Sequence, residues 1–155
     1  MSLDIYLKTV TPVERKSTGI FIRRDGQTVE LSLEEAKLMY ADNAIGEETY
    51  LDDNVFHANL THNLVNMATH VEVDASRGLS LYDILWDVLE IGYDTAKHIL
   101  VYLCNALTFM RENEAMLKEY NPKNGWGTYE QLYRVVKEYS IACIEYPDAT
   151  IEISR

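Results

Sequence analysis

The sequence predicts an α+β fold, in which a small antiparallel sheet packs against about four or five helices. At the start, Leu3, Ile5 and Leu7 alternate with polar residues, which is the period of a half-buried strand. At the end, Ile151 and Ile153 alternate in the same way. Between these segments, the second half of the chain carries apolar residues at helical spacing. We expect the two chain ends to pair in one sheet, because an isolated strand leaves its apolar side uncovered.

A β-hairpin is predicted over residues 19–31. Asp25-Gly26 lies at its centre, and this dipeptide favours the tight turn of a hairpin. Counting outward from the turn pairs Ile22 with Val29, so that apolar side chains face each other across the two strands. We expect this hairpin to contribute to the same sheet as the chain ends.

Helical patterns cover most of the remaining chain. Two of them open with a capping box, formed by Ser32 with Glu35 and by Thr128 with Gln131. The predicted helices are 32–40, 61–71, 80–90, 95–120 and 128–147. The segments between them are expected to form a polar connection over 11–17, an exposed loop over 41–54 and a strand or extended segment over 49–60.

The composition is that of one globular domain spanning residues 1–155. Hydrophobic residues make up 47% of the chain and charged residues 25%, which excludes a disordered protein. The 14 Lys and Arg residues are outnumbered by 25 Asp and Glu residues, which gives a formal net charge of −11. This balance argues against a nucleic-acid partner, because binding phosphates requires cationic side chains. It fits a solvated acidic surface or a basic protein partner.

Neither a targeting segment nor a membrane span is predicted. Residues 1–10 lack a basic segment followed by a long apolar one. The longest apolar tract, 98–110, has 13 residues and contains Asn105, so it is too short to cross a bilayer. We therefore expect a cytoplasmic protein with no membrane partner, in which Cys104 and Cys143 are reduced and mostly buried.

No metal or cofactor site is predicted. The four histidines lack the spacing of zinc ligands, and the common nucleotide- and metal-binding motifs are absent. His62 differs from the others because it follows Thr61, a predicted helix N-cap, and is flanked by Asn59 and Asn63. These polar side chains either serve local capping and turns or bind a ligand beside the helix start. General acid–base catalysis by His62 would need a partner that the sequence does not show.

Trp126 lies between Gly125 and Gly127, directly after Asn124, in the segment that joins the last two predicted helices. Each glycine has a structural role, in a tight turn or just before the cap Thr128. The indole therefore either packs over the seam between these helices or faces a ligand. In both interpretations Trp126 lies beside a helix N-terminus, where free N–H groups favour anions.

Two motifs carry a family resemblance, N-x-T-H-N-L-x-x-M-A over 59–68 and N-P-x-N-G-W-G-x-Y over 121–129. Together with the two chain ends, they resemble an uncharacterised family of small proteins from bacteriophage and bacterial genomes. Residues 69–95 depart from the family pattern, so a contact made there in the family is not implied here. The resemblance carries over to Asn59, Thr61, His62, Asn63, Met67, Asn121, Pro122, Asn124, Gly125, Trp126, Gly127 and Tyr129.

The leading hypothesis is a phage-type cytoplasmic accessory protein that binds a small polar or nucleotide-like ligand and is not an enzyme. Its pocket is expected where the two motifs meet, near His62 and Trp126. One alternative is an acidic interaction module that inhibits a host or defence protein. Another is a small hydrolase or transferase that uses His62 as a general acid or base. The expected ligand-binding residues are Asn59, His62, Asn63, Asn124, Trp126 and Tyr129.

Overall fold

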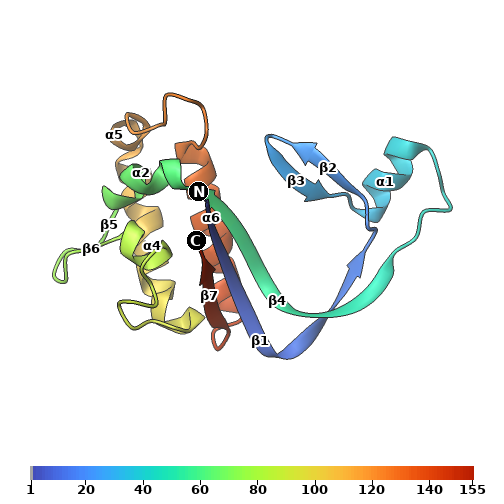
Figure 1. Ribbon diagram of the computed structural model, residues 1–155, viewed down its shortest axis with the longest axis horizontal. Coiled ribbons are helices and arrows are strands. Elements are labelled where there is room, and N and C mark those ends of the chain that lie inside the picture. The colour runs from blue at the N-terminus through green and yellow to red at the C-terminus, as the bar shows by residue number, and fades with distance from the viewer. Residues whose placement is uncertain (1) are drawn as a thin grey trace. The chain divides into compact units, whose positions relative to one another are not determined.

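The computed structural model describes residues 2–155 and has the α+β fold that the sequence predicts (Figure 1). The strands are β1 (Ser2–Ser17), β2 (Phe21–Arg24), β3 (Gln27–Glu30), β4 (Glu48–Thr61), β5 (Glu72–Asp74), β6 (Leu79–Ser80) and β7 (Thr150–Ser154). The helices are α1 (Leu33–Tyr40), the 3₁₀ turn η1 (His62–Leu64), α2 (Val65–Thr69), α3 (Leu81–Leu85), α4 (Ala96–Glu112), α5 (Glu114–Lys118) and α6 (Tyr129–Glu145). The chain forms two compact units, a larger one of residues 2–10 with Asn54–Arg155 and a smaller one of Thr11–Asp53.

Strands β4, β1 and β7 form a three-stranded sheet in that order. The larger unit contains the start of β1, the end of β4 and all of β7. β1 and β7 run antiparallel, with Ile5 opposite Ile153 and Leu7 opposite Ile151. The predicted pairing of the two chain ends is therefore confirmed. Strand alternation places Leu3, Ile5 and Leu7 on the buried face of the sheet.

Helices α4 and α6 pack against each other in the larger unit (Figure 1). The ring of Tyr139 in α6 stacks on Phe56 of β4, with ring centroids 4.8 Å apart, so α6 covers the buried face of the sheet. The buried residues recur at helical spacing, which is the pattern that lets a helix bury one stripe. In α4 they are Ala96, Ile99, Leu103, Ala106 and Met110.

The helices of the larger unit are shorter than the sequence predicts. The segment expected as one helix over 95–120 divides at Asn113, whose side-chain amide donates to the Phe109 carbonyl at 2.9 Å. Asparagine competes in this way with the backbone bonds that continue a helix. Likewise, the expected helix over 80–90 contains only α3, and the expected helix over 61–71 contains η1 followed by α2.

The smaller unit contains the predicted hairpin and the capped helix that follows it. β2 and β3 pair with Ile22 opposite Val29, as the Asp25-Gly26 turn predicts. Helix α1 starts with the predicted capping box, in which the Ser32 hydroxyl accepts from the Glu35 amide. Both local predictions are therefore confirmed.

The prediction that the hairpin joins the main sheet is wrong. β2 and β3 form a separate two-stranded sheet, and β4 is the third strand of the main sheet instead. Residues 11–17, expected as a connection, belong to β1, and the expected loop over 41–54 overlaps β4 from Glu48 onward. The acids of this stretch indicated a loop, but a strand whose side chains are largely exposed accepts polar residues on both faces.

Both cysteines are free thiols, but only Cys143 is buried. Cys104 is exposed because it follows Leu103, which occupies the buried stripe of α4. The prediction that both are buried is therefore wrong for Cys104. Burial raises the pKa of Cys143 to about 12, which keeps this thiol protonated and unreactive. Among the helices of residues 2–155, none has the length and apolar character needed to span a membrane.

Candidate functional site

The two sequence motifs meet in the larger unit, at Gly127. A Cβ atom placed on Gly127 would lie 2.8 Å from Cγ2 of Thr61 and 2.9 Å from Cγ of Leu64. Gly127 also has a φ of +103°, a conformation that side chains with a Cβ rarely adopt. Only glycine therefore allows the loop before α6 to approach the end of β4 this closely. The expected juxtaposition of the two motifs is confirmed.

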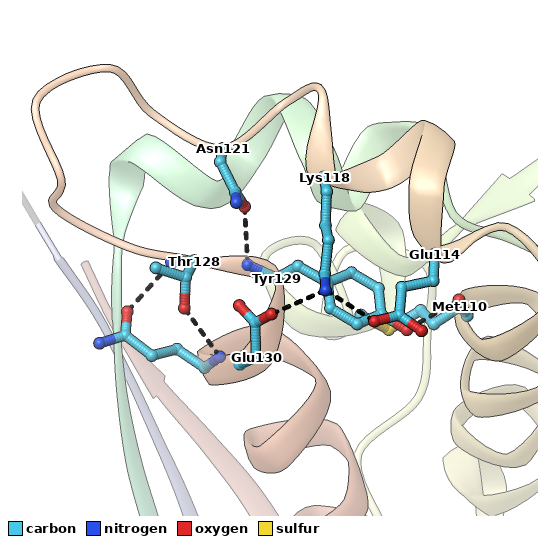
Figure 2. A network of polar contacts seen from close by, with 8 residues as sticks. Met110, Glu114, Lys118, Asn121, Thr128, Tyr129 and Glu130 are labelled. Atoms are coloured by element: carbon cyan, nitrogen blue, oxygen red, sulfur yellow. Dashed lines mark hydrogen bonds and ion pairs between the residues drawn. The ribbon is translucent and has the colours of Figure 1, made fainter.

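The loop before α6 is fixed by hydrogen bonds at both of its ends. Asn124 Oδ1 accepts from the backbone amide of Trp126 at 2.9 Å, and Asn121 Oδ1 accepts from the amide of Tyr129 at 2.8 Å. Thr128 and Gln131 form the predicted capping box at the start of α6. Figure 2 shows the bonds of Asn121 and Thr128 where the loop enters the helix. The loop is therefore held in one conformation by its own polar side chains.

Tyr129 contributes to the core rather than to an exposed surface. Its side chain is only 5% exposed, and its hydroxyl donates to the Met110 carbonyl at 2.8 Å (Figure 2). Burial raises the pKa of Tyr129. Lys118 Nζ lies 5.5 Å from the centre of the ring and bonds Glu114 at 2.7 Å and Glu130 at 3.1 Å. Tyr129 thus links α4, α5 and α6 beneath the loop.

Trp126 is 71% exposed, although the loop that carries it is fixed. His62, Asn63 and Asn124 are exposed as well, and Thr61 and Gly127 lie between the two segments. Within residues 2–155, the side chains of His62, Asn63 and Trp126 make no hydrogen bond, ion pair or ring contact. We call His62, Asn63, Asn124 and Trp126 the Trp126 surface. It combines one flat apolar face with the side chains of His62 and Asn63, which make no polar contact, and with Asn124, whose Oδ1 already accepts from the Trp126 amide.

Asn59, the remaining expected ligand-binding residue, bonds another side chain of the protein. Its amide donates to Asp4 Oδ1 at 2.9 Å, and His57 Nε2 lies 2.9 Å from the same oxygen. The ring of Tyr6 stacks on His57, with centroids 4.6 Å apart and planes inclined by 9°. The bond from Asn59, followed by the bond from His57, lowers the pKa of Asp4. Asn59 therefore positions a carboxylate on the outer face of the sheet.

Asp4 and His57 form a pair that was not predicted from the sequence. The signal was present, because Asp4 and Tyr6 alternate with the buried residues of β1, while His57 and Asn59 are two residues apart on β4. When His57 donates to Asp4 through Nε2, its Nδ1 is left as an acceptor. The carboxylate thus holds the imidazole in one orientation.

The hollows of the smaller unit do not involve the motif residues. The larger hollow has a volume of about 600 Å³ and is lined by Ser17, Thr18, Gly19 and residues 46–50. The amide of Thr18 and the Ser17 hydroxyl donate to Glu30 Oε1, so the carboxylate of the chain itself occupies these donors. Within residues 2–155, no group of three or more His, Cys, Asp or Glu side chains is arranged to hold a metal ion.

In comparisons with known proteins, no family model, no curated protein and no solved structure matches this chain.

Proposed function

We propose that this chain is a ligand-binding protein that uses the Trp126 surface to bind a small polar or nucleotide-like ligand. Trp126 would stack on a flat ring, while His62, Asn63 and Asn124 would form hydrogen bonds at its edge. An indole with polar neighbours is a common arrangement for such ligands. The phage resemblance of the two motifs extends this proposal to a phage-type accessory protein that acts in the cytoplasm.

The observation that carries the proposal is an exposed indole in a fixed loop. Burying a tryptophan removes roughly 200 Å² from water and stabilises a protein by about 4 kcal/mol. Trp126, with 71% of its side chain exposed, forgoes most of this stabilisation. Because the loop is already ordered, a ligand that covers the indole recovers that free energy without a further cost for ordering the loop.

The surroundings of His62 favour binding over acid–base catalysis. No carboxylate contacts the His62 ring within residues 2–155, and the exposed residue that follows it, Asn63, is neutral. The histidines of the larger unit that lie against a carboxylate are His57, beside Asp4, and His98, beside Asp94. A nucleoside or another neutral ring also suits the charge of −11 better than a nucleic-acid strand does.

Fluorescence titration with nucleosides and nucleoside monophosphates tests this proposal. We expect quenching of Trp126, and we expect Trp126→Ala to weaken binding about tenfold or more, because stacking of one base contributes about 1–3 kcal/mol. For this variant binding is followed by calorimetry. His62→Ala should weaken binding to a smaller extent while the melting temperature stays nearly unchanged.

Phe21→Ala provides the matched control, since Phe21 is an exposed aromatic residue of the smaller unit. It should leave the affinity unchanged. The absence of binding for all of these probes, or equal losses in Phe21→Ala and Trp126→Ala, would contradict the proposal. A large loss of stability in both motif variants would mean that the motifs serve packing only.

A further inference from the structure

A second cluster of polar side chains lies in the larger unit and consists of Arg77, Tyr93 and Tyr102. Arg77 follows β5, Tyr93 precedes α4, and Tyr102 lies within α4. Arg77 Nη1 donates to the hydroxyl of Tyr93 and, at 2.9 Å, to the hydroxyl of Tyr102. The two hydroxyls are 3.0 Å apart, and the two rings stack with centroids separated by 5.5 Å.

Backbone contacts hold the members of this cluster in place. The amide of Arg77 donates to Asp74 Oδ1, which also accepts from the Ser76 hydroxyl at 2.7 Å. The amide of Tyr93 donates to the Val88 carbonyl at 3.0 Å. The guanidinium carbon of Arg77 lies 5.6 Å from the centre of the Tyr93 ring, within the range of a cation–π contact. The guanidinium is therefore oriented before any ligand arrives.

The guanidinium of Arg77 has donors that the protein does not use. Both of its hydrogen bonds come from Nη1, and Nε and Nη2 have no partner within residues 2–155. No carboxylate of that range lies within ion-pair distance of Arg77, although the chain has 25 acidic residues. In contrast, Arg24 and Arg155 each pair with a carboxylate.

The hydroxyl pair supplies one further donor. Each phenol has one proton, and the bond between the two hydroxyls uses one of these two protons. Either hydroxyl can donate in this bond, and in each case the proton of the other phenol is left over. The bond with Tyr102 lowers the pKa of Tyr93. A phenol with a lowered pKa is a stronger hydrogen-bond donor. The cluster thus presents unused N–H groups beside an unused O–H group.

We propose that Arg77, Tyr93 and Tyr102 form a binding site for an oxyanion that presents two oxygens side by side, a phosphate or a carboxylate. Nε and Nη2 of Arg77 would bind the two oxygens in the planar arrangement that guanidinium groups favour. Tyr93 would add a hydrogen bond, while Tyr102 positions Tyr93. Asp74 is an acidic residue whose charge acts on this cluster. More distant negative charges act weakly, because salt screens charges beyond about 8 Å in physiological buffer.

Nuclear magnetic resonance of the full chain tests this site through the Nε–H signal of Arg77. Inorganic phosphate and acetate are titrated separately at constant ionic strength. We expect saturable movement of this signal, and a response to phosphate alone, acetate alone or both identifies which oxyanion the site accepts. Tyr93→Phe should weaken binding about tenfold, as expected when a hydrogen bond to a charged group is lost.

Two arginine variants complete the test, with binding followed by the amide signals of residues 74–77. Arg77→Lys keeps the charge but removes the planar pair of donors, so it should weaken binding about as much as Tyr93→Phe does. Arg111→Gln is the control, because Arg111 also donates to a phenol, Tyr133 at 3.4 Å, and should leave binding unchanged. No response to either anion in the unaltered protein, or an equal loss in Arg111→Gln, would overturn the proposal. Nucleoside binding at Trp126 is measured independently, so failure of one site is distinguishable from failure of the other.

Discussion

The two tryptophans of this chain lie in regions with opposite physical character. Trp86, at the end of α3, is 3% exposed and stacks on Tyr82 with ring centroids 5.6 Å apart. Its carbonyl also accepts a hydrogen bond from Arg155. Trp126 is 71% exposed and has no ring partner within residues 2–155. One tryptophan stabilises the fold through burial, whereas the other depends on its neighbours to stay in place.

The difference shows that a fixed conformation does not require a buried side chain. The loop of Trp126 is held by Gly127 against Thr61 and by the side chains of Asn121 and Asn124. These contacts act on the backbone, so the indole itself is free to contact a ligand. Mutations should therefore separate the two regions, with side-chain truncation affecting one and backbone changes affecting the other.

Truncation of the two tryptophans should give the largest contrast. Trp86→Ala removes a buried aromatic side chain, and we expect the free energy of unfolding to fall by about 3–5 kcal/mol. Trp126→Ala removes an exposed side chain and should change it by less than about 0.5 kcal/mol. Urea unfolding followed by circular dichroism measures both values. Similar losses in the two variants would show that Trp126 also serves the core.

Glycine substitutions give the next contrast, within the loop itself. In Gly127→Ala the new Cβ meets Thr61 and Leu64 at less than 3.0 Å in a positive-φ conformation. We expect the free energy of unfolding to fall by about 3 kcal/mol, since overpacking and backbone strain each cost roughly 1–3 kcal/mol. Gly125→Ala is the matched control, because Gly125 has a φ of +74° but no atom within 4 Å of the new Cβ.

Gly125→Ala should therefore lower the free energy of unfolding only through backbone strain, by about 1 kcal/mol. The difference between these two free energies measures the contact between the motifs. If the two variants were equally stable, the close approach at Gly127 would contribute nothing to the fold. Thermal unfolding of both variants in one buffer is sufficient for the comparison.

Much of the fold could be predicted from the sequence because local patterns determine it. The alternation at Ile5 and Ile153 gave the pairing of the chain ends, and Asp25-Gly26 gave the register of the hairpin. The sequence did not predict that the hairpin lies outside the main sheet. The third strand of that sheet is β4, and the acidic residues of β4 are typical of a loop. The local sequence pattern determines the pairing within a hairpin. Competition among strands that are far apart in the sequence determines which strands join the main sheet.

The candidate site was predictable only in part. The motifs indicated that His62 and Trp126 lie in neighbouring segments, and Gly127 brings those segments together. The sequence could not show which motif residues are exposed and which are buried. Tyr129 was therefore expected at the surface, whereas its hydroxyl donates to the Met110 carbonyl in the core. Asn59 was expected to meet a ligand, but it bonds Asp4, which is 55 residues away in the sequence. Such partners become visible only when the strands are paired.

The smallest expected effect concerns pH and the ion pairs beneath the loop of Trp126. A hydrogen bond from its own backbone amide, followed by the bond from Lys118, lowers the pKa of Glu130 in the folded protein. The ionised carboxylate therefore favours folding above the ordinary pKa of a glutamate, and this contribution is lost as the pH falls through the lowered value. Because the pair is exposed to solvent, we expect less than about 1 kcal/mol. Glu130→Gln should reduce stability by this amount at neutral pH and have almost no effect at an acidic pH below the lowered pKa of Glu130. Glu138→Gln, at an exposed position of the same helix, should show no such pH dependence. Equal curves for the two variants in urea unfolding at both pH values would mean that Lys118 and Glu130 do not stabilise the start of α6, leaving the capping box and Asn121 to hold it alone.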